Sequence, residues 1–331
     1  MTSVITGTGH HLPSRKITNE ELAPQLNSSA EWIEERSGIR QRYFIAPGET
    51  NRGLGEQAAR KALADADLQP TDIDAIIFAT LSPDVAFPGS GVFLQEALGL
   101  EGIPALDVRA QCSGFLYALS VAHGWLSSGM YRRILVVGSE VHSTGLDLTP
   151  EGRGVSVLFG DGAGAAVLEA RREEEAGILD IRLGADGRGA HLLTCERPGS
   201  QFHPSISAAD IEAGRHYPTM EGRAVFRRAV ELLERELHAL FERHAIDPVT
   251  EDVLLIPHQS NRRINEMVAS RLGLRDEQVV HTIELFGNTT AASIPMALDI
   301  ARKDERARPG RLVALGAFGS GLTWGTALIR F

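Results

Sequence analysis

The second half of this chain repeats the plan of the first half at a nearly constant spacing. A helix at residues 224–244 leads through a turn into an apolar strand at 253–256, as residues 56–67 lead into an apolar strand at 73–80. Each pairing alone is weak, but similar spacings across several elements are hard to obtain by chance. The repeat predicts two similar α/β lobes related by a pseudo-twofold axis, with sheets between helices. The paired positions are Thr80 with His258 (178 residues apart), Leu98 with Leu272 (174), Leu135 with Leu312 (177) and Gly164 with Gly325 (161).

The central predicted strands are apolar on both faces, which is typical of a parallel sheet covered by helices on both sides. A charged stretch with turn character at residues 171–176 separates the two halves. We therefore predict an N-terminal lobe of residues 1–172 and a C-terminal lobe of residues 173–331. The predicted strands are residues 4–9, 73–80, 105–108, 134–138, 164–168, 253–256, 312–315 and 325–329.

The composition argues against several classes of protein. A net charge of −10 disfavours extensive nucleic-acid binding, which requires a basic surface. The 331 residues contain no apolar run that approaches the length of a membrane span. The only two cysteines, Cys112 and Cys195, lie far apart, and the first residues lack the features of a signal peptide. We therefore expect a cytoplasmic protein that binds neither nucleic acid nor membrane.

Residues 106–119 read as a buried strand that turns sharply at Gln111 and Cys112 and continues directly into a helix. Unpaired backbone N–H groups and the positive end of the helix dipole meet at such a turn. We therefore expect the pKa of the Cys112 thiol to lie below its ordinary value, which favours a nucleophilic thiolate. The alternative is that Cys112 is a small buried apolar side chain, the commonest role of a free cysteine.

His258 and Asn288 are the candidate partners of Cys112. His258 lies beyond the carboxyl end of a predicted parallel strand, where open α/β sheets place ligand groups. Asn288 lies 176 residues after Cys112, which is close to the spacing of the repeat. Either residue alone is more often structural, as a strand-end histidine or a turn asparagine. The repeat nevertheless predicts that the three side chains meet near the shared axis.

A set of cysteine, histidine and asparagine suits two chemistries. In a cysteine hydrolase, asparagine orients a histidine base. In a thioester-condensing enzyme, histidine and asparagine both donate hydrogen bonds to a thioester carbonyl while a carboxylate leaves as carbon dioxide. The two-lobed repeat and the Gly319-Ser320-Gly321 loop favour the condensing enzyme. A non-catalytic acyl-binding protein is disfavoured because all three polar positions are present.

Seven short motifs are distributed along nearly the whole chain. They are Glu31-Trp32 with Arg36-Ser37-Gly38-Ile39-Arg40, Ala86-Phe87-Pro88, Cys112-Ser113-Gly114-Phe115, Phe159-Gly160-Asp161-Gly162-Ala163-Gly164-Ala165-Ala166, Pro257-His258-Gln259, Gly287-Asn288-Thr289 and Thr323-Trp324-Gly325. Together they resemble the motifs of the ketoacyl-acyl-carrier-protein synthase III family of the thiolase superfamily. The resemblance implies a thiolase-like fold, in which two βαβαβαββ lobes form a five-layer αβαβα sandwich.

The resemblance also implies a two-step acyl transfer. Cys112 would take the acyl group from an acyl-CoA starter, and His258 and Asn288 would then hold malonyl-carrier protein while it loses carbon dioxide. The resulting carbanion would attack the acyl-cysteine and yield 3-oxoacyl-carrier protein, which initiates fatty acid biosynthesis. Coenzyme A thioester is a substrate in this scheme, which needs no metal or redox cofactor. The backbone N–H groups of Cys112 and Ser320 would form the oxyanion hole.

The same resemblance implies where coenzyme A binds. Trp32 and Arg153 would hold its adenine between them, and Arg36 would contact its nucleotide end. A planar ring and a guanidinium both stack well on a base. Phe226 would line the pantetheine tunnel, and Asn261 would anchor the region of His258. For Trp32 the alternative is an ordinary core position.

Partner binding is implied in two places. Arg227, Arg263 and Arg271 match a basic patch that meets the acidic acyl carrier protein, and local positive charge in an acidic chain would steer that partner. For Arg271 a solvated helix face is the alternative. Phe87 would cross the interface of a homodimer into the acyl pocket of the second copy.

Several positions depart from the pattern of the family. Gln111 stands where alanine is usual, and Ser320 replaces a glycine at a position where a positive φ would be strained. The segments 146–152 and 194–217 are longer than expected. These departures keep open a second hypothesis, an acyltransferase or condensing enzyme of secondary metabolism with the same fold and another acceptor.

Overall fold

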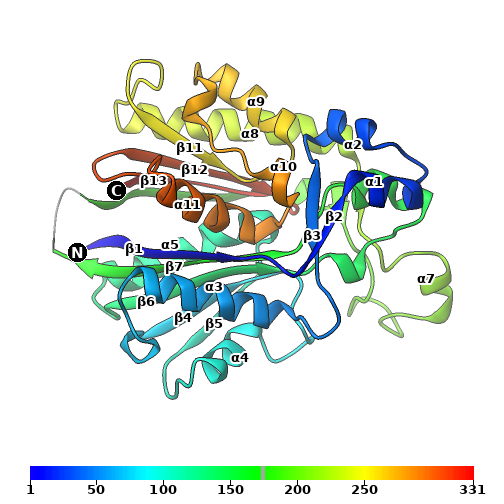
Figure 1. Ribbon diagram of the computed structural model, residues 1–331, viewed down its shortest axis with the longest axis horizontal. Helices are drawn as coiled ribbons and strands as arrows, with labels where there is room; N and C mark the ends of the chain where they lie inside the picture. Colours follow the sequence, from blue (N-terminus) through cyan, green and yellow to red (C-terminus); the bar gives the residue numbers. More distant parts are fainter. Residues whose placement is uncertain (173–175) are drawn as a thin grey trace.

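The computed structural model describes residues 1–172 and 176–331, and two β-sheets alternate in it with three layers of helices (Figure 1). In order across the first sheet, the strands are β1 (Thr2–His11), β7 (Gly162–Arg171), β6 (Arg133–Glu140), β4 (Ala75–Ala79) and β5 (Ala105–Val108). In order across the second sheet, they are β11 (Val253–Pro257), β12 (Leu312–Gly319), β13 (Thr323–Arg330) and β8 (Gly177–Ala185). This is the predicted five-layer α/β architecture.

The sequence correctly predicted the two-sided burial of the central strands. Every residue of β4 and of β11 is buried. In the first sheet β4 pairs in parallel with β5 and with β6, and in the second sheet β11 pairs in parallel with β12. Helices cover both faces of each sheet, and for this reason neither face of these strands carries a polar stripe.

Two helices, α5 (Gly114–Ser127) and α11 (Ser293–Lys303), lie between the sheets and pack against strands of both (Figure 1). One hydrophobic cluster joins Val136 of the first sheet and Leu315 of the second to Leu119 of α5 and Leu298 of α11. The outer faces are covered by α3 (Asn51–Asp65) and α4 (Ser90–Ala97) on the first sheet and by α8 (Gly222–Arg243) and α9 (Arg262–Arg271) on the second.

The internal repeat is present in the topology. In both sheets, strands of the same order and direction occupy corresponding positions, so that β4 corresponds to β11, β6 to β12 and β7 to β13. The counterpart of β5 is a single parallel bridge between Leu255 and Val279. The predicted division between residues 172 and 173 adjoins residues 173–175, which lie outside the described residues, so this boundary stays a prediction.

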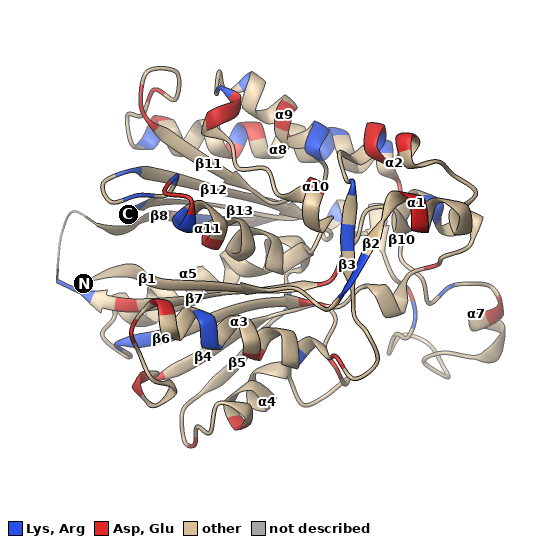
Figure 2. Ribbon diagram, in the orientation of Figure 1, with Lys and Arg blue, Asp and Glu red and all other residues tan. Residues whose placement is uncertain are grey.

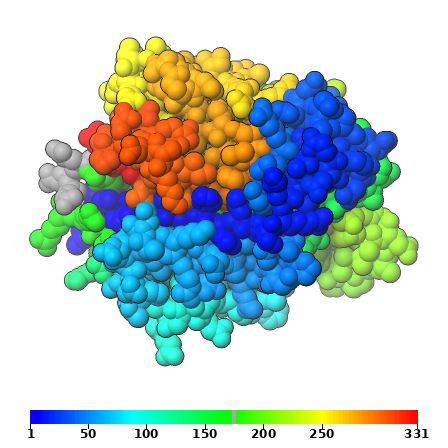
Figure 3. Space-filling model, viewed as in Figure 1, coloured from blue at the N-terminus to red at the C-terminus, as the bar shows by residue number. Residues whose placement is uncertain are grey.

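Most of the short elements gather at one end of the molecule, on the right in Figure 1. The segment around α7 projects there from the body (Figure 3). Within the described ranges, no helix combines the length and apolarity that crossing a membrane requires. The short strands and helices are β2 (Arg15–Thr18), β3 (Gln41–Phe44), β9 (Leu193–Thr194), β10 (Thr219–Met220), α1 (Asn19–Leu22), α2 (Ala30–Ser37), α6 (Arg153–Ser156), α7 (Ala208–Glu212) and α10 (Ile283–Phe286).

The close approach of the α11 region to the first sheet predicts the effect of one substitution. A Cβ atom on Gly138 of β6 would lie 2.4 Å from the carbonyl oxygen of Ala291. We therefore expect Gly138→Ala to lower the free energy of unfolding by about 1–3 kcal/mol, because backbone must move. Gly124→Ala, in the interior of α5 with open space around the new atom, should instead be neutral or stabilising by up to about 1 kcal/mol. Urea denaturation of both variants measures this, and equal stability of Gly138→Ala and the parent would contradict the packing.

Candidate active site

The structure brings Cys112, His258 and Asn288 together around one cavity of about 90 Å³. They come from three distant places: the turn before α5, the loop after β11 and the loop after α10. All three are at least nine-tenths buried. The other residues that line the cavity are Leu158, Phe159, Leu193, Met220, Gly222, Val225, Phe226, Ala229, Ser260, Asn261, Ile264, Phe318 and Gly319.

Cys112 lies in the predicted sharp turn between β5 and α5. This turn is the 3-10 element η3 (Gln111–Ser113), and Gln111 within it has a φ of 43°. A left-handed backbone is uncommon for a residue other than glycine. Gly319 of β12 packs directly on the turn, because a Cβ there would lie 3.0 Å from the backbone nitrogen of Cys112. The turn that carries Cys112 therefore packs against the end of β12 in the second sheet.

The expectation of a lowered thiol pKa is wrong. Burial, together with the negative charge of Glu140, raises the pKa of Cys112 to about 12. Hydrogen bonds from the backbone N–H groups of Ser320 and of Cys112 itself act in the opposite direction but are the smaller effects. The sequence indicated the helix start correctly, but it did not show that the thiol is removed from water.

His258 is held by a residue that the sequence reasoning missed, Ser293. The Nδ1 atom of His258 lies 2.6 Å from the Ser293 hydroxyl, which also accepts a hydrogen bond from the N–H of Gln259 at 3.3 Å. If Ser293 donates its hydrogen to Nδ1, the proton of the neutral ring is on Nε2. Burial lowers the pKa of His258 to about 3, so the ring is neutral at physiological pH. Among the described residues, the buried Nε2 has no hydrogen-bond partner.

Asn288 is oriented by its own turn. Its Oδ1 atom accepts a hydrogen bond from the N–H of Thr290 at 2.9 Å, and its backbone N–H donates to the carbonyl of Leu158 at 2.8 Å. With the oxygen engaged in the turn, the amide NH₂ group is the part of Asn288 that remains to act as a donor. Two donors, the NH₂ group of Asn288 and Nε2 of His258, thus belong to the cavity that contains Cys112.

The repeat position assigned to Asn288 requires a correction. The element that corresponds to η3 is η8 (Thr290–Ala292), in which Thr290 has a φ of 42°, nearly that of Gln111. Ala291 is therefore the counterpart of Cys112, and Asn288 lies three residues earlier. The short helix α10 adds residues before this turn in the second lobe. The sequence alone did not show where these additional residues lie.

The strain expected at Ser320 does not arise. The positive φ of the loop falls on the adjacent Gly321, at 135°, and Ser320 is not among the non-glycine residues with a positive φ. The Ser320 hydroxyl donates a hydrogen bond to the carbonyl of Leu193 in β9. Leu193 and Met220, at the two ends of the long segment 194–217, both line the cavity.

The residues predicted to bind coenzyme A lie at and around this cavity. The guanidinium carbons of Arg36 and Arg153 lie 5.5 and 4.9 Å from the centroid of the Trp32 ring. Asn261 donates a hydrogen bond to the carbonyl of Arg36 at 2.9 Å, and Phe226 lines the cavity. The longer segment 146–152 contributes Leu146 and Leu148 to the cluster that contains Trp32.

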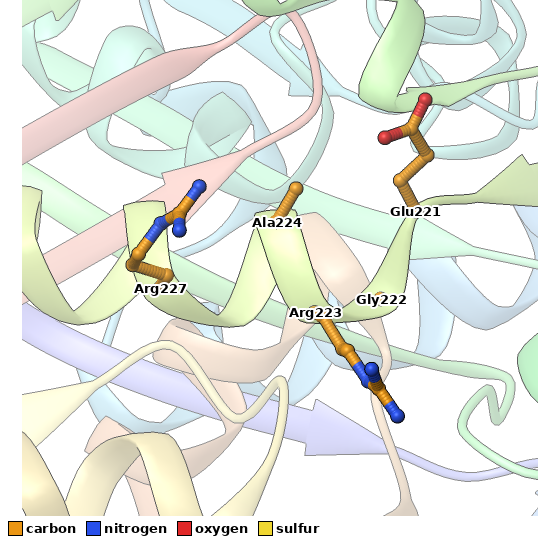
Figure 4. Close-up of a pocket in the computed structure, with 5 residues that line it drawn as sticks. All are labelled: Glu221, Gly222, Arg223, Ala224 and Arg227. Carbon is orange, nitrogen blue, oxygen red and sulfur yellow. The ribbon is translucent and has the colours of Figure 1, made fainter.

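The three arginines of the predicted basic patch have different surroundings. Arg227 lines a surface hollow of about 400 Å³ at the start of α8, with Arg223 and Glu221 (Figure 4). The guanidinium carbon of Arg263 lies 5.9 Å from the centroid of the Phe226 ring, whereas Arg271 forms an ion pair with Glu234 at 2.6 Å. Acidic residues also lie on α8 and α9, so the surface is mixed rather than uniformly basic (Figure 2).

Phe87 lies apart from the cavity. It is 86% exposed, in the loop between β4 and α4, and does not line the cavity of its own chain.

The burial of His258 predicts its protonation behaviour. Its folded-state pKa of about 3 lies below the ordinary 6.5, so the ring should stay neutral as the pH falls through 6.5. The unfolded chain then binds more protons, and His258 should therefore lower the stability of the fold progressively between about pH 6.5 and pH 3. Ring-nitrogen chemical shifts in the native protein, assigned with His258→Ala, measure this directly. A titration midpoint near 6.5 would contradict the burial.

Comparisons with known proteins identify the family. Two family models match the chain: 3-oxoacyl-[acyl-carrier-protein (ACP)] synthase III over residues 106–187 and its C-terminal counterpart over residues 247–331. The beta-ketoacyl-[acyl-carrier-protein] synthase III of Thioalkalivibrio sulfidiphilus is 45% identical over 327 residues, covering 99% of this chain and 98% of the relative. That of Helicobacter pylori is 43% identical over 323 residues, covering 97% and 96%.

Solved structures agree with the sequence comparisons. The crystal structure of 3-oxoacyl-[acyl-carrier-protein] synthase III from Aquifex aeolicus superposes with a TM-score of 0.90 at 38% identity, covering 99% of this chain and 100% of the other. The chain belongs to the beta-ketoacyl-[acyl-carrier-protein] synthase III family, the condensing acyltransferases of fatty acid synthesis.

Proposed function

We propose that this enzyme joins an acyl-CoA starter to malonyl-acyl carrier protein through an acyl-Cys112 intermediate. In the first step the Cys112 sulfur attacks the thioester carbonyl, and coenzyme A leaves as its thiol with the proton of Cys112. In the second step the malonyl group loses carbon dioxide, and the carbanion attacks the acyl-cysteine carbonyl. The Cys112 thiolate leaves and is protonated, and 3-oxoacyl-carrier protein is released. The family relationship supports this reaction class.

The observation that carries the proposal is the shared cavity of Cys112, His258 and Asn288, with Nε2 of His258 buried and without a partner among the described residues. A neutral imidazole N–H and an amide NH₂ can both donate to the oxygen of the enolate that forms as carbon dioxide leaves. A protonated histidine would be costly at this buried position. The lowered pKa of His258 therefore suits a hydrogen-bond donor better than a general acid.

The oxyanion hole for the attacked carbonyl would be the backbone N–H groups of Cys112 and Ser320. Both act on the Cys112 sulfur, and so both lie close to the atom at which the new bond forms. Because the left-handed backbone falls on Gly321, a serine at position 320 presents its N–H as a glycine would.

Coenzyme A would bind at the mouth of the cavity, with its adenine stacked between Trp32 and Arg153 and its nucleotide end beside Arg36. Arg153 already lies over the Trp32 ring, so a base would have to enter between them. Phe226 would flank the pantetheine, and Asn261 would hold the chain that carries Arg36. We propose no metal or redox cofactor, because decarboxylation supplies the driving force.

The carrier protein would dock on Arg227, Arg263 and Arg271. Arg227 lies on α8, whose Gly222 lines both the cavity and the surface hollow, and Arg263 is adjacent in sequence to Ile264, which lines the cavity. Arg271 would have to exchange its bond to Glu234 for an acidic group of the carrier protein. An exposed ion pair is worth about 1 kcal/mol or less, so this exchange costs little.

We also propose a homodimer that forms through the open edge of β5 and acts in the cytoplasm. β5 is the last strand of its sheet, and an unpaired strand edge invites pairing with another chain. Apolar side chains beside this edge are exposed, among them Phe87, Val85 at 45% and Val92 at 38%. In a dimer Phe87 would enter the acyl pocket of the second copy. Both cysteines are free, in keeping with a reducing compartment.

Intact-protein mass spectrometry tests the condensing role. After mixing with acyl-CoAs of increasing length, we expect an acyl adduct on the parent protein but not on Cys112→Ala, since only the thiol can form the thioester. Malonyl-acyl carrier protein should discharge the adduct with release of carbon dioxide. An adduct that malonyl-acyl carrier protein leaves in place would favour the alternative acyltransferase. A complete lack of adducts would contradict the assignment of Cys112 as the nucleophile.

Native mass spectrometry tests the dimer. We expect the parent to have twice the mass of the chain, and Phe87→Arg to shift the population to monomer because a charge would be buried at the interface. Met130→Arg is the matched control, since Met130 is also an exposed apolar residue, at 60%, but follows α5. A monomeric parent protein would contradict the proposed dimer interface at β5.

A further inference from the structure

A buried carboxyl that the proposed reaction does not use, Glu140, lies at the last position of β6. Its residue has no exposed surface. Burial raises the pKa of Glu140 to about 7, so a substantial fraction of the group is ionised at physiological pH. No hydrogen bond in the described residues connects it to a lysine or arginine, and the groups that form hydrogen bonds with it are hydroxyls and a backbone N–H.

One set of donors is the loop after β4, which leads to Phe87. The Thr80 hydroxyl donates to Glu140 at 3.1 Å, the Leu81 N–H at 3.2 Å and the Ser82 hydroxyl at 2.5 Å. Thr80 accepts from the amide of Asn51 at 2.9 Å, so its own hydrogen is available for the carboxylate. Glu140 thus fixes the first residues of the loop that carries Phe87.

The other donor belongs to the turn that orients Asn288. The Thr290 hydroxyl lies 3.0 Å from Nε2 of His142, two residues after Glu140, and it lowers the pKa of Glu140. The N–H of the same Thr290 donates to Oδ1 of Asn288. One residue therefore connects the buried carboxyl to the amide that the condensation uses.

The nucleophile turn adjoins the same place. η8 packs against both β6 and η3, and a Cβ on Gly114, two residues after Cys112, would lie 3.3 Å from the Cβ of Ala291. The titratable groups near Glu140 include Cys112 from η3 and His142 from the loop after β6, whose backbone N–H donates to the buried Asp161 at 2.7 Å. The donors from the loop after β4 are neutral. Burial lowers the pKa of His142 to about 4, so that ring is neutral as well.

We propose that Glu140 is a positioning residue of the condensing site: it connects the Phe87 loop and the Asn288 turn to the end of β6, next to the turn that carries Cys112. This inference rests on the proposed function. A carboxylate that is surrounded by donors holds the two loops in one arrangement. The negative charge of Glu140 adds to the larger effect of burial in opposing ionisation of the Cys112 thiol.

The pH profile of Cys112 alkylation by iodoacetamide in Glu140→Gln tests the charge. Removing the negative charge should move the midpoint to lower pH, and a tenfold larger acid dissociation constant of the thiol makes alkylation about tenfold faster at a pH well below the midpoint. Asp161→Asn is the matched control, because Asp161 is also fully buried but is not among the groups that act on Cys112. A Glu140→Gln profile that matches the parent would overturn the electrostatic role.

Thr290→Val tests the positioning role and decides the question if Glu140→Gln does not fold. This variant removes the Thr290 hydroxyl, which links the Asn288 turn to the end of β6, but keeps the Thr290 N–H that donates to Asn288 and the charge of Glu140. We expect malonyl decarboxylation to fall about tenfold while the alkylation profile stays that of the parent. Decarboxylation at the parental rate would overturn the connection. Alkylation by iodoacetamide needs no thioester substrate, so its result does not depend on the acyl-adduct test. A failure of the role proposed for Glu140 can therefore be distinguished from a failure of the proposed condensing reaction.

Discussion

The burial of α5 and α11 between two sheets is the constraint on which the rest of the structure depends. Most residues of a helix in that position are buried, so they must be mainly apolar and small enough for backbones to approach. Gly138 and Gly114 meet this requirement at the point where the turns before the two helices touch. The same packing places η3, which carries Cys112, beside η8. The packing that the core requires therefore also determines where the site lies.

Burial also decides the charge state of the site. Removal from water disfavours the charged form of every titratable group, so it raises the pKa of Cys112 and of Glu140 and lowers the pKa of His258. A resting site of neutral thiol and neutral imidazole suits a reaction in which the developing charge belongs to the substrate. The protein then supplies donors rather than charges, in agreement with a hydrogen bond that holds His258 by Nδ1.

The positions that depart from the pattern of the family cluster around the cavity. The Ser320 hydroxyl donates a hydrogen bond to the carbonyl of Leu193, which directly precedes the long segment 194–217, and Gln111 adopts a left-handed backbone just before Cys112. The segment 146–152 packs beside Trp32. These differences leave Cys112, His258 and Asn288 in place and alter the walls that surround them. In the proposed function such walls would affect which acyl starter enters.

The sequence by itself predicted the central strands of both sheets, although not β8, and it singled out the three polar residues that share the cavity. Short apolar runs and the spacing of the repeat depend on local pattern, and local pattern persists whatever the rest of the chain does. The tertiary structure alone decided the protonation of Cys112 and the register of the second turn. Burial depends on distant strands such as β12, and the added helix α10 moved Ala291, rather than Asn288, into the place that corresponds to Cys112. Ser293 and Glu140 likewise acquire their roles only through partners that lie 35 and about 60 residues away, because hydrogen bonds between distant segments leave no periodic signal in the sequence.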